Sequence, residues 1–299
     1  MKTLEVIREF DPWKSPLCTC PRKYSLHPYT GCSHFCLYCY AVSYIGLKES
    51  TPKIKFLNKL ARDLGKIEKN SIIELSTSSD PYPPVEENLK LTRHTLEILV
   101  RHNVKILITT KSNLVVRDSD VIKRAPASVM ITITTLDDKL ARIIEPNAPP
   151  PSDRIKAVEE LRKQGVPVGV RIDPVIPFIN DDPHDLKELA TRVIQAGALH
   201  IVTSSFKAKM NNLKRLSEYL PRDIASKLIS LYREKGTWIH GYLYLNTNTR
   251  RSMLQPVIAV AREYGITYAT CREGLMELFN APTCDGSHLI NFNNFHAEN

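Results

Sequence analysis

Three cysteines near the start of the chain have a spacing that is typical of an iron–sulfur site. Cys32, Cys36 and Cys39 are separated by three and then by two residues, and Tyr38 stands directly before the last of them. A [4Fe–4S] cluster that is held by three thiolates has one iron open to an outside ligand, whereas a structural zinc site is closed by four protein ligands. The spacing therefore predicts a [4Fe–4S] cluster with one open iron.

Four further cysteines remain, which is the number that one closed metal site needs. Cys18 and Cys20 precede the three-cysteine loop, and Cys271 and Cys284 lie near the end of the chain. A site that all four shared would join the two ends of the chain. The sequence predicts a second [4Fe–4S] cluster here, with zinc and a set of unligated buried thiols as the alternatives.

These sites must be carried by a framework, and the pattern of the chain predicts an α/β fold. Short β-branched runs alternate with longer amphipathic stretches, which is typical of βα units and a parallel sheet. We expect strands at 25–30, 71–75, 104–109, 128–133, 166–172 and 199–203, and helices at 88–102, 116–123, 152–164 and 183–196. Six such units are too few to close an eight-stranded barrel. We therefore expect a partial (β/α)6 TIM-like barrel at 25–236, after an N-terminal segment at 1–24, with a small C-terminal extension at 237–299 packed on it.

Charged and hydroxyl side chains follow several of the expected strands. Lys111, Arg171, Asp173 and Lys207 all come just after an apolar run. In a βα barrel the loops at the carboxyl ends of the strands form the active site. We therefore expect these four side chains at one rim.

The composition is that of a globular protein with an excess of positive charge. The chain has 299 residues, of which 42% are hydrophobic, and Lys and Arg outnumber Asp and Glu by 41 to 32. The excess is concentrated in residues 1–70 and 207–235. Two basic regions could face a polyanion together, or they could be solvated helix faces. DNA is the polyanion that we expect as a partner.

Targeting signals and membrane-spanning runs are not predicted. The first residues lack the apolar core of a signal peptide, and no apolar run approaches the length of a membrane span. We expect a cytoplasmic protein, because an oxygen-sensitive cluster and seven cysteines fit a reducing compartment. Twenty prolines and abundant Ile, Lys and Arg point to a thermophile.

Several segments together resemble the radical S-adenosylmethionine (SAM) superfamily. The segments are 27–41, 78–82, 109–112, 171–177, 271–274 and 284–288, and within the superfamily they are similar to the spore photoproduct lyase-related branch. The resemblance implies that the amino and carboxylate groups of SAM occupy the open iron. One electron from a reductant such as ferredoxin or flavodoxin then cleaves SAM to methionine and a 5′-deoxyadenosyl radical.

SAM needs an anchor for its carboxylate, its ribose and its adenine. Lys111 suits the carboxylate, and hydroxyls at the strand ends suit the ribose. The cofactor contacts that we expect are Tyr38, Ser78, Lys111, Ser112, Thr134 and Arg171.

The resemblance also marks a departure from the branch. Spore photoproduct lyase repairs a thymine dimer in DNA and returns a hydrogen atom from a cysteine after the second strand, a position that falls near Thr77 here. A threonine hydroxyl holds its hydrogen too strongly to donate it to a carbon radical. We therefore expect Tyr82 or Tyr242 as the hydrogen donor, with Tyr244 as a further candidate.

Three functions remain open at this point. The first is a radical SAM enzyme that abstracts hydrogen from a large substrate such as a nucleic acid. The second is a nucleic-acid-binding protein that clusters merely stabilise, without turnover. The third is a radical SAM enzyme that acts on a protein or a small molecule.

Overall fold

The computed structural model describes residues 3–10 and 15–294. Its strands are β1 (Ile7–Glu9), β2 (Tyr24–Leu26), β3 (Tyr29–Thr30), β4 (Thr51–Pro52), β5 (Ile72–Leu75), β6 (Lys105–Thr110), β7 (Ala127–Thr132), β8 (Val168–Val175), β9 (His200–Ser205), β10 (Thr237–Ile239), β11 (Tyr242–Tyr244) and β12 (Thr267–Thr270).

Helices alternate with these strands along most of the chain. They are α1 (Val42–Ile45), α2 (Phe56–Leu64), α3 (Glu86–Leu89), α4 (Leu91–Arg101), α5 (Ser119–Ile122), α6 (Asp138–Ile144), α7 (Pro151–Lys163), α8 (Pro183–Gln195), α9 (Met210–Ser217), α10 (Arg222–Lys235) and α11 (Thr247–Glu263). Three 3₁₀ segments are η1 (Asn113–Asp118), η2 (Met276–Leu278) and η3 (Ser287–Asn294).

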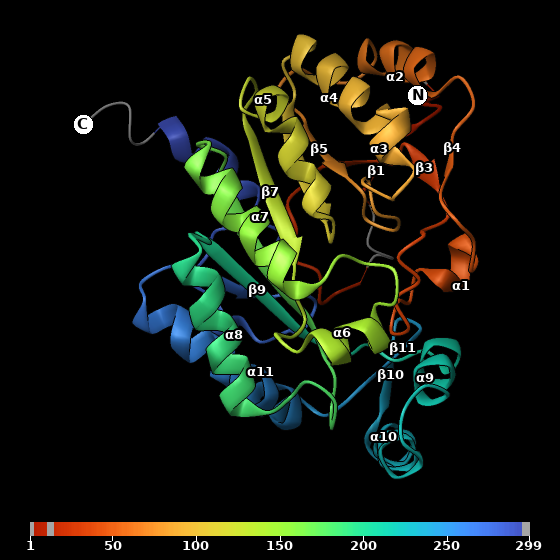
Figure 1. The fold of residues 1–299 in the computed structure, drawn as a ribbon, viewed down its shortest axis with the longest axis vertical. Helices are drawn as coiled ribbons and strands as arrows, with labels where there is room; N and C mark the ends of the chain where they lie inside the picture. The colour runs from red at the N-terminus through yellow and green to blue at the C-terminus, as the bar shows by residue number, and fades with distance from the viewer. Residues whose placement is uncertain (1–2, 11–14, 295–299) are drawn as a thin grey trace.

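The main sheet has eight strands in the order β1-β2-β5-β6-β7-β8-β9-β12. All neighbours from β2 to β12 are parallel, and β1 pairs antiparallel with β2 at one edge. Central strands such as β7 are buried along their whole length, because side chains cover both of their faces. Figure 1 shows α4, α7 and α8 on the outside, with β5, β7 and β9 behind them.

The architecture confirms an α/β partial barrel, and it differs from the sequence prediction in the number of strands. Six parallel strands were expected, but β12 adds a seventh because α11 returns the chain to the free edge of β9. The outer strands β1 and β12 do not pair with each other in the described part of the chain, so the sheet stays open. Among the described residues, no helix has both the length and the apolar character that a bilayer span requires.

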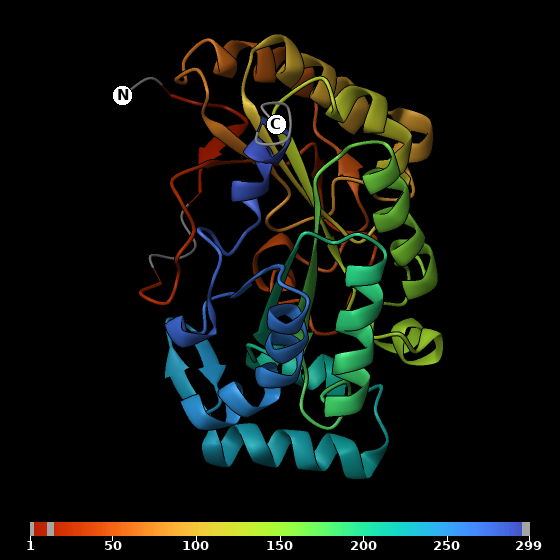
Figure 2. The same cartoon turned by 90° about the vertical axis from the view of Figure 1, so that its left-hand side faces the viewer.

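A buried ion-pair cluster fastens the two ends of the chain together. Lys23 Nζ lies 2.6 Å from a carboxylate oxygen of Glu74 and 2.5 Å from one of Asp285, and all three side chains are almost fully buried. Figure 2 shows the C-terminal segment, in blue, running beside the N-terminal segment, in red. This cluster sets the position of residue 285 against the edge of the sheet that carries β2.

The first prediction concerns this cluster. We expect Lys23→Met to lower the free energy of unfolding by about 3–5 kcal/mol, because it leaves two buried carboxylates without their cation. The neighbouring Arg22 forms an exposed ion pair with Glu9, so Arg22→Met is the matched control and costs below about 1 kcal/mol. Urea unfolding followed by circular dichroism measures both. If both variants lose the same free energy of unfolding, Lys23 does not hold the two ends of the chain together.

Candidate active site

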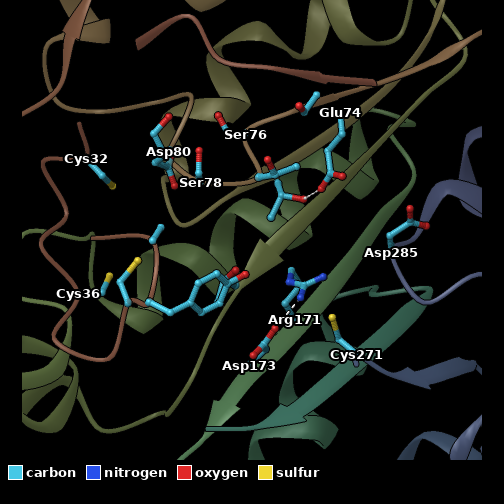
Figure 3. Close-up of a pocket in the computed structure, with 18 of the residues that line it drawn as sticks. Cys32, Cys36, Glu74, Ser76, Ser78, Asp80, Arg171, Asp173, Cys271 and Asp285 are labelled. Atoms are coloured by element: carbon cyan, nitrogen blue, oxygen red, sulfur yellow. Dashed lines mark hydrogen bonds and ion pairs between the residues drawn. The ribbon is translucent and has the colours of Figure 1, made fainter. Parts of the chain in front are cut away.

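A cavity of about 470 Å³ lies at the carboxyl ends of the parallel strands. Its wall includes the loops that follow β5, β6, β9 and β12 and the carboxyl half of β8, and Lys111, Arg171, Asp173 and Lys207 are all part of it. All seven cysteines of the chain line this one cavity. Figure 3 shows Cys32 and Cys36 on one side and Cys271 on the opposite side, beside Arg171.

The loop that carries Cys32, Cys36 and Cys39 has little regular structure of its own, so other elements hold its backbone. Arg215 of α9 donates hydrogen bonds to the carbonyl oxygens of Leu37 at 3.0 Å and Cys39 at 2.7 Å. From the same helix, the Asn212 amide donates to the carbonyl of Tyr38 at 2.9 Å. These contacts fix the backbone between the second and third cysteine.

A buried ion pair fixes the side chain of Tyr38. Its hydroxyl donates to Glu145, whose other oxygen lies 2.6 Å from Nη1 of Arg154. Burial alone would raise the pKa of Glu145, but Arg154 and Lys111 hold it below its ordinary value, so the carboxylate stays charged. Thr134 also donates to Glu145, at 3.2 Å. The residue before the third cysteine is thus tied to α6 and α7.

Lys111 is a second cation beside this loop. Its Nζ lies 5.6 Å from the centre of the Tyr38 ring. Burial lowers the pKa of Lys111, but Cys36 and Glu145 raise it overall, so the ammonium stays charged. The position of Lys111 is set by Asp80, which accepts its backbone N–H at 2.8 Å and also accepts from the Thr110 hydroxyl. This arrangement presents a positive charge beside the cysteine loop.

The loop after β5 is held by a neutral histidine. His27 Nε2 lies 3.2 Å from the backbone nitrogens of both Thr77 and Ser78, and 3.0 Å from the Ser78 hydroxyl. Burial, together with Lys53 and Arg8, lowers the pKa of His27 to about 4. An unprotonated ring nitrogen can accept these hydrogen bonds, and a protonated one cannot.

The other four cysteines come together from the two ends of the chain. The sulfur atoms of Cys20 and Cys284 are 3.6 Å apart, Cys18 interacts with Cys20, and Cys271 interacts with Cys284. The hydrogen bond from Cys284 and the charges of Arg171 and Lys207 lower the pKa of Cys271.

The spacing of the thiols differs from that of a zinc site. Tetrahedral zinc with Zn–S bonds of about 2.3 Å brings all its sulfurs to roughly 3.8 Å from one another. Among the described residues, no three thiols of either set lie within 4.8 Å of one another. Neither set therefore groups three thiols at zinc spacing, although Cys20 and Cys284 form one close pair at 3.6 Å.

The structure brings most of the predicted site residues to the cavity and leaves four outside its wall. Tyr38, Ser78, Lys111 and Arg171 line it with the seven cysteines. Ser112 instead caps η1 by accepting the N–H of Leu114, and Thr134 is buried against Glu145. Tyr82 belongs to the main core, and Tyr242 packs behind the ring of Tyr40. Sequence reasoning missed Glu145, Arg154 and Arg215, because their roles arise from tertiary contacts alone.

Comparison with known proteins relates the chain to one enzyme superfamily. The Radical SAM superfamily matches residues 26–190, which is more than half of the chain. An uncharacterized protein of Methanocaldococcus jannaschii is 34% identical over 172 residues, which cover 53% of this chain and 62% of the relative. A protein of Pseudomonas phage M6 named radical SAM Nalpha-GlyT isomerase is 23% identical over 260 residues, which cover 82% of this chain and 53% of the relative.

Solved structures show the same fold at low sequence identity. Spore photoproduct lyase with dinucleoside spore photoproduct superposes with a TM-score of 0.68 at 13% identity, over 90% of this chain and 79% of that one. Streptococcus suis SuiB bound to S-adenosylmethionine gives a TM-score of 0.56 at 12% identity, over 82% of this chain and 49% of that one. These likenesses show a shared partial-barrel fold.

The second prediction concerns the pH dependence that His27 causes. Its pKa is about 4 in the folded chain and about 6.5 when unfolded, so the unfolded state binds more protons between these values. The stabilisation is therefore complete above about pH 6.5 and is lost as the pH falls toward 4. We expect urea unfolding to show that the wild type loses about 1–2 kcal/mol more than His27→Gln between pH 7 and pH 5. Parallel pH profiles of the two proteins would contradict this role.

Proposed function

The chain belongs to the radical SAM superfamily, and we propose that it is an enzyme that uses SAM to abstract hydrogen from a large substrate. Membership in the superfamily implies one [4Fe–4S] cluster and SAM. When bound, these groups supply a 5′-deoxyadenosyl radical after one-electron reduction by a donor such as ferredoxin or flavodoxin. The observation that carries the proposal is the meeting of the three-cysteine loop and Lys111 at one cavity.

The residues around this cavity fit the two groups. Cys32, Cys36 and Cys39 would hold the cluster, since all three line the cavity from one loop and that loop is held by α9 and Glu145. Lys111 would bind the carboxylate of SAM as a point charge. Ser78 would contact the ribose, and the backbone beside Tyr38 would meet the adenine. The surrounding wall would exclude water from a reactive radical.

We propose a second [4Fe–4S] cluster at Cys18, Cys20, Cys271 and Cys284. Support comes from the contacts among the four thiols and from the cations Arg171 and Lys207, which favour a thiolate at Cys271. Neighbouring positive charge stabilises thiolates, and thiolates are the form that binds metal. A cluster is preferred to zinc because the first site already implies the machinery that assembles iron–sulfur clusters.

We propose a nucleic acid, DNA in particular, as the large substrate. The net charge of +9 supports it, as does the pair Arg8 and Lys53: Arg8 lines the cavity, and Arg8 lowers the pKa of Lys53, which burial already lowers. Like charges kept this close favour a polyanion. The solved spore photoproduct lyase holds a dinucleoside lesion, which is compatible with this class of substrate.

The third prediction tests the enzyme itself. We expect the anaerobic protein, reduced with dithionite and supplied with SAM, to form 5′-deoxyadenosine, and Cys36→Ala to form none. Ser112→Ala is the matched control, because Ser112 is buried but is not part of the cavity wall, and it should retain the activity. Liquid chromatography measures the product.

Two outcomes would count against the third prediction. If the wild type has an intact cluster and forms no 5′-deoxyadenosine, the enzyme proposal fails. The cluster would then only stabilise a nucleic-acid-binding protein that has no turnover. If Ser112→Ala also forms no 5′-deoxyadenosine, the Ser112 hydroxyl contacts the cofactor after all.

The fourth prediction concerns the second metal site. We expect roughly eight irons per chain, and a fall to about four in Cys284→Ala, because two cubanes carry four irons each. X-ray absorption at the iron and zinc edges, together with chemical iron analysis, measures this. If the wild type contains about four irons and no zinc, the second metal site does not exist. If it contains about four irons and one zinc, the four cysteines bind zinc and not a second cluster.

A further inference from the structure

Arg272 is a buried cation of the cavity wall whose donors lack acceptors. The residue is only 6% exposed, and its Nε and Nη2 atoms have no hydrogen-bond partner in the described part of the chain. Its guanidinium lies 4.6 Å from the ring centre of Tyr242 and 5.9 Å from that of Tyr40. Aromatic faces attract a cation, but they do not accept its hydrogen bonds in full. A buried guanidinium in this state is an incomplete site.

Two other cations of the cavity wall, Lys23 and Arg171, are neutralised by carboxylates. Lys23 has Glu74 and Asp285, and Arg171 has Asp173 at 2.5 Å. These pairs need no ligand to balance their charge.

Glu273, the sequence neighbour of Arg272, does not supply the missing carboxylate. It lies 3.2 Å from Lys207 and 2.7 Å from Arg250, and it accepts from the backbone and the hydroxyl of Ser205. Its oxygens are therefore occupied by other donors.

A second cation, Lys209, also lies over the ring of Tyr242. Lys209 Nζ lies 4.6 Å from the ring centre of Tyr242. Lys209 and Arg272 thus both lie 4.6 Å from the centre of the same ring, and burial, together with the charge of Arg272, lowers the pKa of Lys209. Lys209 donates to the Ser43 hydroxyl at 3.2 Å, and among the described residues neither Lys209 nor Arg272 has an ion pair with a carboxylate. Positive charge accumulates here beside the last cysteine of the loop.

We propose that Arg272 and Lys209 form a phosphate-binding subsite for a nucleic-acid substrate, which deepens the proposed function and rests on it. The forked guanidinium of arginine fits the oxygens of a phosphate, and lysine adds a point charge. Tyr40, which also lines the cavity, provides an aromatic ring next to it, as nucleic-acid grooves commonly do. The carboxylate of SAM has its own cation in Lys111, which lies over Tyr38, two residues before Tyr40.

A phosphate is favoured over the carboxylate of a peptide by a second pair of cations. The Arg8 and Lys53 pair is a second place where cations stand close together without a carboxylate partner among the described residues. A polyanion with repeated charges satisfies both pairs, whereas a peptide with one acidic side chain satisfies one.

The test measures binding of a fluorescent single-stranded DNA of about 12 nucleotides to the anaerobic holoenzyme at several salt concentrations. We expect Arg272→Gln to weaken binding about tenfold and to reduce the slope of log affinity against log salt by about one. Lys209→Gln should lower the same slope, and it serves as a second variant because Lys209 is not fully buried. Arg251→Gln is the matched control, since Arg251 forms a half-exposed pair with Glu277 on the same region of the fold.

A second readout separates this subsite from the SAM site. The change that SAM causes in the paramagnetic resonance signal of the reduced cluster, and 5′-deoxyadenosine formation without DNA, should both persist in Arg272→Gln. Loss of the spectral change with unaltered DNA binding would assign the guanidinium to SAM and overturn the proposal. Salt-insensitive DNA binding, or tight salt-sensitive binding of an acidic peptide in its place, would also overturn it. Absence of 5′-deoxyadenosine in the wild type would instead count against the enzyme itself.

Discussion

The ion pair of Glu145 and Arg154 is the interaction on which the cysteine loop depends. Residues 31–41 have few backbone hydrogen bonds of their own, so their shape is imposed from outside. The hydroxyl of Tyr38 is held by the buried carboxylate of Glu145, which stays charged because Arg154 lies 2.6 Å away and Lys111 adds a further positive charge. Breaking a buried pair costs about 3–5 kcal/mol, so the loop can move only at a high energy. A rigid loop would keep the three thiolates on three irons of the proposed cluster and leave its fourth iron open.

The ends of the chain contribute to the cavity as much as its central strands do. β12 lies against β9 at one edge, and the segment after it brings Cys284 and Asp285 to the segment that precedes β2. An open sheet leaves its interior accessible from the side between its edges. The contacts between the two ends cover part of that opening with thiols and a buried ion-pair cluster. The C-terminal region therefore completes the cavity that the strands begin.

The sequence predicted the features that depend on local spacing. The three-cysteine loop, the α/β alternation and the polar residues at strand ends all follow from patterns within short segments. Ser112 and Thr134 could not be placed, because a hydroxyl at a strand end serves equally well as a helix cap or as a donor to a buried carboxylate, and only the fold decides. Glu145 gave no signal, since an acidic residue before a proline is ordinary in a loop. Its importance comes from Arg154, nine residues later on another helix.

The sharing of one cavity by seven cysteines constrains the chemistry that the protein can perform. A thiol gives up its hydrogen atom to a carbon radical far more readily than a hydroxyl does, so four unligated thiols opposite a radical source would compete with the substrate. Metal ligation removes that hazard, because a ligated sulfur carries no hydrogen. The cations Arg171 and Lys207 act in the same direction by favouring the thiolate at Cys271. The second cluster that we propose would therefore protect the radical as well as join the ends of the chain. It would also leave the hydrogen that completes the proposed reaction to come from SAM-derived 5′-deoxyadenosine or from another group at the cavity.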